Sequence, residues 1–222
     1  MRPRDRIVAP VVRTKHSAEY RRMVLERRAT AAECIGILEP GQTAHLLTHG
    51  QFSFVDMIDA VVAQAEPAVL YLSAWTGIEP QYRRLGEHFH AGRITGARIL
   101  LDRSSYGKEP AACEYIARTF GADNIRTSRN HCKLAVLGPF SIAGSMNLNM
   151  NPRIENADIT RDPVLADFYR AFFDYCFASL DPVDWRGNLP GGTEIPAEYR
   201  AAPPDSPGGG DDLDALLADM ID

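Results

Sequence analysis

Apolar and polar residues follow one another along the chain in blocks that predict strands and helices in turn. Two nearly continuous apolar runs, at 68–73 and 97–102, are typical of buried strands. Further strands are expected at 44–50, 124–128, 131–137 and 140–144. Apolar residues at helical spacing predict helices over 17–33, 53–65, 79–92, 109–120 and 163–180. This alternation predicts an α/β fold, with a mixed, largely parallel sheet and helices on both faces.

Changes in composition divide the chain into four expected parts. These are a basic N-terminal extension with a helix (1–43), the α/β domain (44–186), a Pro/Gly-rich linker (187–210) and an acidic, amphipathic tail helix (211–222). The tail places five apolar residues on one helical face, and such a short helix is marginal by itself in water. We expect it to bind a groove on an unidentified protein partner, with packing against its own domain as the alternative.

Overall composition is that of a soluble globular protein, with 45% apolar and 24% charged residues among 222. Membrane insertion is not expected, because no apolar run approaches the ~20 residues that cross a bilayer. Four cysteines without close pairing favour reduced thiols and a cytoplasmic location, and they predict no structural zinc site.

Charge is distributed unevenly behind the net value of −5. Residues 1–30 hold nine Lys and Arg against three acids, whereas residues 203–222 hold six aspartates and no base. The basic segment suits contact with nucleic acid, because neutralising phosphates supplies most non-specific affinity. An ordinary solvated helix explains it equally well, and both interpretations stay open.

The stretch NHCKLAVLGPFSIAGSMN, residues 130–147, carries the candidate chemistry. His131 and Lys133 are two apart in a predicted strand and therefore share one face. Ser145 and Asn147 are two apart at the end of the next strand. An imidazole and an ammonium beside an apolar run are costly to bury unless an anion meets them. These four residues predict a pocket for a phosphodiester, and the alternative is a buried hairpin with polar ends.

This pattern resembles the phospholipase D superfamily, whose signature is H-x-K-x4-D-x6-G-S-x-N, and the resemblance covers about residues 44–180. It implies a phospholipase D-like α-β-α sandwich. It also implies that His131 is a nucleophile forming a phosphohistidine, while Lys133, Ser145 and Asn147 bind the non-bridging phosphate oxygens. Glu155 is the expected carboxylate that orients the imidazole, and Asp158 is the alternative.

Two departures from the signature concern the turn between the strands. Glycine stands at position 138 in place of the signature aspartate, and the segment that follows is one residue short. In the family this aspartate lies at a turn away from the phosphate, so a Gly-Pro turn is an acceptable replacement. The alternative is a degenerate site that binds phosphate without catalysis.

The chain holds a single H-x-K motif, whereas the superfamily mechanism uses two. The resemblance therefore implies a homodimer with its active site across the two-fold axis, and it implies no metal or cofactor. Arg126, Arg129 and Arg153 are expected to attract the substrate. Trp75, at the end of a predicted strand, suits stacking on a base, with simple packing as the alternative.

The leading functional hypothesis is a metal-independent nuclease of the phospholipase D type. A non-catalytic nucleic-acid-binding module with a partner-binding tail is the alternative. A phospholipid phosphodiesterase or transphosphatidylase comes third, because the sequence shows no basic amphipathic helix for a lipid surface.

Overall fold

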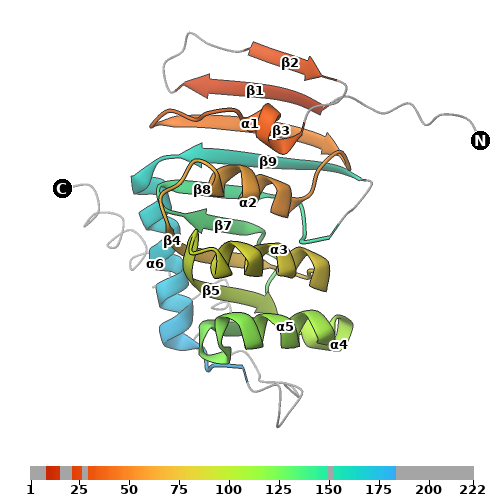
Figure 1. Ribbon diagram of the computed structural model, residues 1–222, viewed down its shortest axis with the longest axis vertical. Coiled ribbons are helices and arrows are strands. Elements are labelled where there is room, and N and C mark those ends of the chain that lie inside the picture. The colour runs from red at the N-terminus through yellow and green to blue at the C-terminus, as the bar shows by residue number, and fades with distance from the viewer. Residues whose placement is uncertain (1–8, 16–21, 27–29, 150–152, 184–222) are drawn as a thin grey trace, which may run out of the picture. The chain divides into compact units, whose positions relative to one another are not determined.

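The computed structural model describes residues 9–15, 22–26, 30–149 and 153–183. All of them belong to the first of two compact units, Met1–Leu189. They form a nine-stranded sheet in the order β2-β1-β3-β9-β8-β7-β4-β5-β6, with helices packed on both faces (Figure 1). The predicted linker, 187–210, and the predicted tail helix, 211–222, lie outside the described residues.

Most elements stand where the apolar pattern predicts them. In chain order from the third strand they are β3 (Gln42–His49), α2 (Phe54–Val62), β4 (Ala68–Ala74), α3 (Glu79–His90), β5 (Ile94–Asp102), α4 (Ser105–Lys108), α5 (Pro110–Phe120), β6 (Ile125–Ser128), β7 (Leu134–Leu137), β8 (Phe140–Gly144), β9 (Ile154–Arg161) and α6 (Pro163–Ser179). A short 3₁₀ helix, Ala122–Asn124, precedes β6.

The helix expected over 17–33 is not what the described residues of that segment form. Strands β1 (Ala9–Lys15) and β2 (Arg22–Glu26) pair antiparallel, and β1 continues the sheet beside β3. Helix α1 is confined to Ala31–Ile35, because the Thr30 side chain accepts a hydrogen bond from the Glu33 backbone and so starts the helix there. Backbone pairing with a neighbouring strand has overridden the thin helical pattern.

The sheet is mixed, as predicted, but its pairing is less parallel than expected. Only β4–β5 and β5–β6 pair in parallel, and the other six pairings among the described strands are antiparallel. Helical crossovers join the parallel strands, whereas a two-residue turn joins β7 to β8. Strand β9, absent from the prediction, lies between β3 and β8 and pairs with both.

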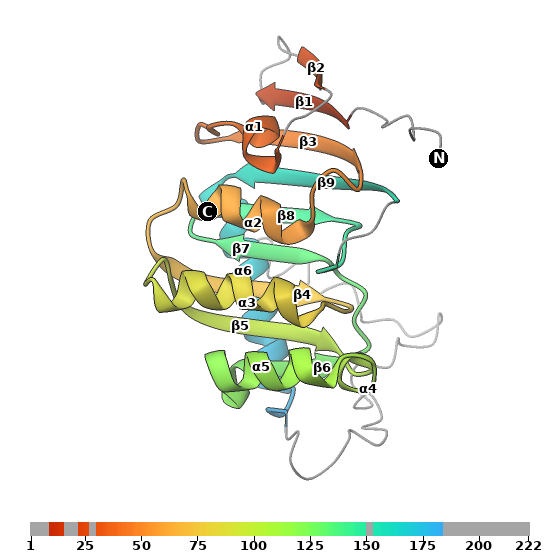
Figure 2. The same cartoon turned by 45° about the vertical axis from the view of Figure 1, so that its right-hand side comes forward.

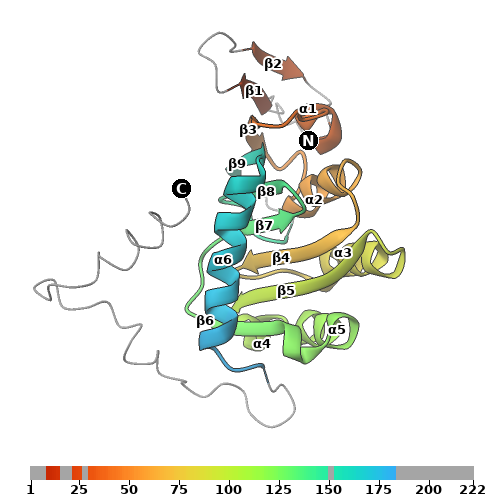
Figure 3. The same ribbon diagram turned by 90° about the vertical axis from the view of Figure 1, so that its left-hand side faces the viewer.

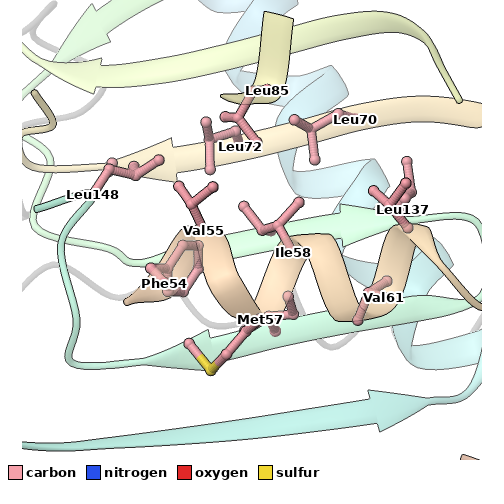
Figure 4. Close-up of a cluster of buried hydrophobic side chains, with 14 of the residues drawn as sticks. Phe54, Val55, Met57, Ile58, Val61, Leu70, Leu72, Leu85, Leu137 and Leu148 are labelled. Carbon is pink, nitrogen blue, oxygen red and sulfur yellow. The ribbon is translucent and has the colours of Figure 1, made fainter. Parts of the chain in front are cut away.

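Helix α2 shows how the helices cover the first face of the sheet. Ser53 caps it through a capping box with Asp56. Its apolar side chains, Phe54, Val55, Met57, Ile58 and Val61, lie against side chains from β4, β7 and α3 (Figure 4). This packing forms the larger hydrophobic core and holds the strands of the site rigid.

The second face is covered by α6, which lies on the opposite side of the sheet from α2, α3 and α5 in Figure 3. Ala166 and Phe173 of this helix pack on Leu100, Leu134 and Val136 of the sheet. The expectation of helices on both faces is therefore confirmed. None of the helices in the described part of the chain has the length and apolar character needed to cross a membrane.

Gly144, at the end of β8, permits unusually close contact with β9. A Cβ atom at this position would lie 2.3 Å from the Asn156 carbonyl oxygen and 2.9 Å from the Ala157 Cα. Both are backbone atoms of a paired strand, so neither can move aside without breaking the ladder. Only glycine fits here.

We therefore expect Gly144→Ala to lower the free energy of unfolding by about 1–3 kcal/mol, the usual cost of overpacking. Chemical denaturation measures this change. Gly96→Ala is the matched control, because a Cβ there would meet nothing closer than 3.6 Å in another strand. Equal stability of the two variants would contradict the packing argument.

Candidate active site

One edge of the sheet collects the predicted site residues. Strands β4, β5, β6 and β8 end at this edge, whereas β7 and β9 begin there, as the alternating pair directions require. It lies on the right in Figure 2, where β5 ends beside α4. The predicted residues at this edge are Trp75, Arg129, His131, Lys133, Ser145, Asn147, Arg153 and Glu155. Open α/β sheets commonly bind ligands beyond the carboxyl ends of their parallel strands.

The hairpin β7–β8 sets the positions of Lys133 and Ser145. Its register pairs Leu134 with Ala143, and the Gly144 amide donates to the Lys133 carbonyl at 3.2 Å. The segment between position 138 and Gly144 is one residue shorter than in the signature, and the two-residue turn Gly138–Pro139 accommodates this. Gly138 opens that turn with φ +53°, at the far end of the hairpin from the site. The departure from the signature therefore lies away from the candidate phosphate-binding groups.

His131 and Lys133 do not share a strand face, because β7 begins only at Leu134. The His131 side chain is exposed, whereas Lys133 is 5% exposed. The Lys133 ammonium folds back and donates to the His131 carbonyl oxygen at 2.5 Å. The two residues are nevertheless held together, through a backbone contact in place of the predicted strand geometry.

Asn130 fixes the segment that carries His131, a role that the motif does not predict. This side chain is 6% exposed, and its Oδ1 accepts from the Cys132 amide at 2.9 Å. Its Nδ2 donates to Ser73 Oγ at 2.9 Å, the Ala74 carbonyl at 3.2 Å and the Leu100 carbonyl at 2.9 Å. The nucleophile candidate is thus tied to the ends of β4 and β5. The sequence offered one hint of this role, the position of Asn130 directly before His131. A single asparagine is also common in turns, so the sequence alone could not distinguish a structural role from an ordinary turn residue.

Glu155 contacts Ser145 in this structure. The Ser145 hydroxyl donates to the Glu155 carboxylate, and the same oxygen accepts from the Asn156 amide at 3.0 Å. Within the described residues no hydrogen bond joins Glu155 to His131, so the orienting contact predicted for Glu155 is not present in the single chain. Asp158, the alternative, pairs with His45 at 2.7 Å.

The environment of Lys133 opposes its charge. Burial lowers the pKa of its ammonium, and the nearby Cys132 and Glu155 counteract this effect. Glu155 therefore acts on two candidate phosphate ligands: it accepts a hydrogen bond from Ser145, and its negative charge favours the charged form of Lys133. A phosphate oxygen entering here would meet an ammonium with little competing water.

Asn147 and Glu155 line a small, partly open pocket together with Thr48, Gly50 and Phe52. Asn147 Oδ1 is buried there and has no hydrogen-bond partner among the described residues. The loop is anchored to the end of β4, because the Leu148 amide donates to the Thr76 carbonyl at 3.1 Å. An unsatisfied buried acceptor is costly, so a ligand group that donates a hydrogen bond to Asn147 Oδ1 would gain affinity here, whereas a phosphate oxygen would have to contact the amide nitrogen of this side chain.

Trp75 lies beside His131, with ring centroids 5.6 Å apart and an interplanar angle of 48°. The Lys108 ammonium stands 3.8 Å from the centroid of the same indole. Neither the ring pair nor Lys108 was predicted. The structure thus brings Trp75 to the candidate nucleophile.

Arg126 is the one predicted substrate-binding residue whose environment contradicts the prediction. It is 9% exposed, near the start of β6 and away from the site edge. Its guanidinium donates to the carbonyls of Asp123 at 2.8 Å and Ile125 at 3.1 Å, and it lies 4.5 Å from the Phe177 ring centroid. These contacts tie β6 to α6, and they leave the Arg126 guanidinium engaged away from the site edge.

Arg129 and Arg153 are exposed at the site edge. Arg129 directly precedes the buried Asn130, and Arg153 directly precedes β9. Their predicted contact with substrate stays a prediction. Over the described part of the chain, no three His, Cys, Asp or Glu side chains come together as a metal site would require.

The sequence matches no family model and no curated protein. The structure is similar to that of NucT from Helicobacter pylori, with a TM-score of 0.50 and 13% identity over 64% of this chain and 99% of NucT. Nuc from Salmonella typhimurium, a phospholipase D family member, matches with a TM-score of 0.46 and 17% identity over 57% of this chain and 88% of Nuc. Phosphatidylserine synthase from Haemophilus influenzae matches with a TM-score of 0.48 and 12% identity over 72% of this chain and 42% of the synthase.

At these identities a likeness concerns the fold, so the activity has to be argued from the site. The expected α/β fold with a mixed sheet is confirmed, and it is similar to the fold of NucT.

The coupling of Lys133 to Glu155 makes a direct prediction. Glu155→Gln keeps an acceptor for Ser145 but removes the charge that raises the pKa of Lys133, so this pKa should fall further. Titration of the lysine Cε resonance by NMR measures the shift. Asp158→Asn removes another carboxylate of β9, one paired with His45, and should leave the Lys133 pKa unchanged. An unchanged Lys133 pKa in Glu155→Gln would exclude the coupling.

Proposed function

We propose that the chain is a phosphodiesterase of the phospholipase D type, a metal-independent nuclease that acts through His131. The single observation that supports this most is the hairpin register. Gly144 lies opposite Lys133, so Ser145 follows directly at the sheet edge where His131 is exposed. Packing alone does not require a nearly buried ammonium, a hydroxyl and a carboxylate at one point.

In the proposed first step, an imidazole nitrogen of His131 attacks the phosphorus of a diester. The bond from phosphorus to the leaving oxygen breaks, and that oxygen takes a proton. Lys133, Ser145 and Asn147 stabilise the charge on the non-bridging oxygens. In the second step, water attacks the phosphohistidine, the bond from nitrogen to phosphorus breaks, and the imidazole is regenerated.

The proton for the leaving oxygen needs a general acid, and we assign it to His131 of a second copy. A two-fold axis beside the site edge would bring two such imidazoles together in a homodimer. In the second step the neutral imidazole of that copy accepts the proton of the attacking water. Glu155 then acts mainly in two ways: it favours the charged form of Lys133, and it holds the Ser145 hydroxyl by a hydrogen bond.

Nucleic acid is the proposed substrate, because several exposed cations lie at the same sheet edge as His131. Lys108, Arg129 and Arg153 are exposed along the same edge, where each can neutralise a backbone phosphate. The basic segment 1–30 supports the same proposal through its charge. We further propose a cytoplasmic location and an unidentified protein partner for residues 211–222.

The activity is tested by incubating the full chain with DNA and RNA in EDTA. We expect cleavage by the wild type and a loss of about a thousandfold or more in His131→Ala, since the nucleophile is removed. His90→Ala, which changes an exposed histidine at the end of α3, is the matched control and should cleave normally.

Other outcomes separate the alternatives. Binding without cleavage by wild type and variant alike would favour the non-catalytic module. Activity that disappears only in EDTA would exclude the metal-free mechanism, and cleavage of phospholipid instead of nucleic acid would favour the lipid enzyme.

The shared active site predicts how mixtures behave. After subunit exchange between equal amounts of wild type and His131→Ala, about a quarter of the activity should remain if two His131 side chains form each site. About half should remain if each chain works alone. A monomeric mass by light scattering at micromolar concentration would also rule out the dimeric arrangement.

A further inference from the structure

Trp75 is held at the site edge without being part of the core. Its ring is half-buried, and neither hydrophobic cluster of the described residues includes it. Ser105 Oγ donates to the Trp75 carbonyl at 2.8 Å, which fixes the backbone next to α4. A large aromatic ring that is positioned but not packed into the core is available to a ligand.

Lys108 covers this ring in the free protein. Its ammonium lies 3.8 Å from the indole centroid, and the residue is exposed. No salt bridge among the described residues involves Lys108. The ammonium is held by the indole face and by its charge attraction to Asp102, whose pKa it helps to lower, and the flexible side chain can leave the ring while it stays near that carboxylate.

A stacking ligand would displace this lysine at small cost. An exposed cation–π contact is worth about 2- to 5-fold in an equilibrium. Stacking of a nucleic-acid base on an aromatic ring is worth about 5- to 150-fold. A base therefore displaces the Lys108 ammonium from the face of the indole, and the released ammonium can bind a neighbouring backbone phosphate.

We propose that Trp75 and Lys108 form a subsite for the unpaired base beside the scissile phosphate, so that the preferred substrate is single-stranded nucleic acid. The ring centroid is 5.6 Å from that of His131, which restricts the stacked base to a nucleotide adjacent to the reacting phosphate. In a duplex the faces of each base are covered by its neighbours, so such a base cannot stack on Trp75. This inference rests on the proposed function, because it assumes that His131 acts on a nucleic-acid phosphate.

The test compares cleavage kinetics on one fluorescein-labelled oligonucleotide, offered single-stranded and as a duplex, in EDTA. The wild type should cut the single strand faster. Trp75→Ala should raise KM for the single strand about 5- to 150-fold with little change for the duplex, and Trp75→Phe should restore most of the preference. Lys108→Gln should raise KM for the single strand and reduce its dependence on salt.

Matched controls separate this subsite from a loss of folding or of general charge. Arg83→Gln removes another exposed cation over an aromatic ring, 4.9 Å from the Tyr115 centroid on the helices, and should leave the preference unchanged. Misfolding of Trp75→Ala would slow both substrates equally, so the ratio between them is the diagnostic quantity. An oligonucleotide with an abasic residue beside the cut should reproduce the Trp75→Ala defect in the wild type.

Two failures have different meanings. Equal cutting of both substrates, or a preference that survives Trp75→Ala, would overturn the subsite while leaving the nuclease in place. A wild type that cuts neither strand form would overturn the proposed function and this inference together.

Discussion

The close contact between β8 and β9 at Gly144 is the constraint on which the site depends. Because no side chain fits between these backbones, the two strands keep one register, and that register carries Ser145 to the edge beside Glu155. The same hairpin sets Lys133 opposite Gly144. Main-chain pairing thus sets where the backbones of two candidate phosphate ligands and a carboxylate lie.

Burying the ammonium of Lys133 is costly, and the structure offsets this cost in two ways. The His131 carbonyl accepts a hydrogen bond from it, and Glu155 lies near enough to favour its charged form. Neither contact neutralises the ammonium fully, since burial still lowers the pKa. A bound phosphate would supply the missing negative charge. The free energy that burial of Lys133 costs in folding is then recovered as affinity for an anion.

Much of the fold could be predicted, because buried strands and amphipathic helices leave periodic apolar patterns, as at 68–73 and α2. Strand β9 could not, since its sequence IENADITR mixes charges into both faces. Strand β2 was mistaken for a helix because its own residues carry a thin helical pattern, and that pattern does not contain the pairing with β1.

Within the candidate site, motif spacing predicted the histidine, lysine, serine and asparagine, and the structure has all four at one sheet edge. The spacing did not predict Asn130 or Lys108. Asn130 bonds to Leu100 and Lys108 lies over Trp75, and both contacts join segments that are about thirty residues apart in the sequence.

The place of β9 between β3 and β8 has a consequence for how the chain folds. Strand β3 (Gln42–His49) pairs with β1 on one side, and on its other side it pairs with β9, which ends at Arg161. During synthesis, more than a hundred residues must emerge before this edge of β3 is covered, and closing so long a loop is slow. The unpaired edge is a template for other strands in the meantime. A growing chain therefore passes through a stage in which it is most prone to aggregation, and that stage ends only when β9 inserts.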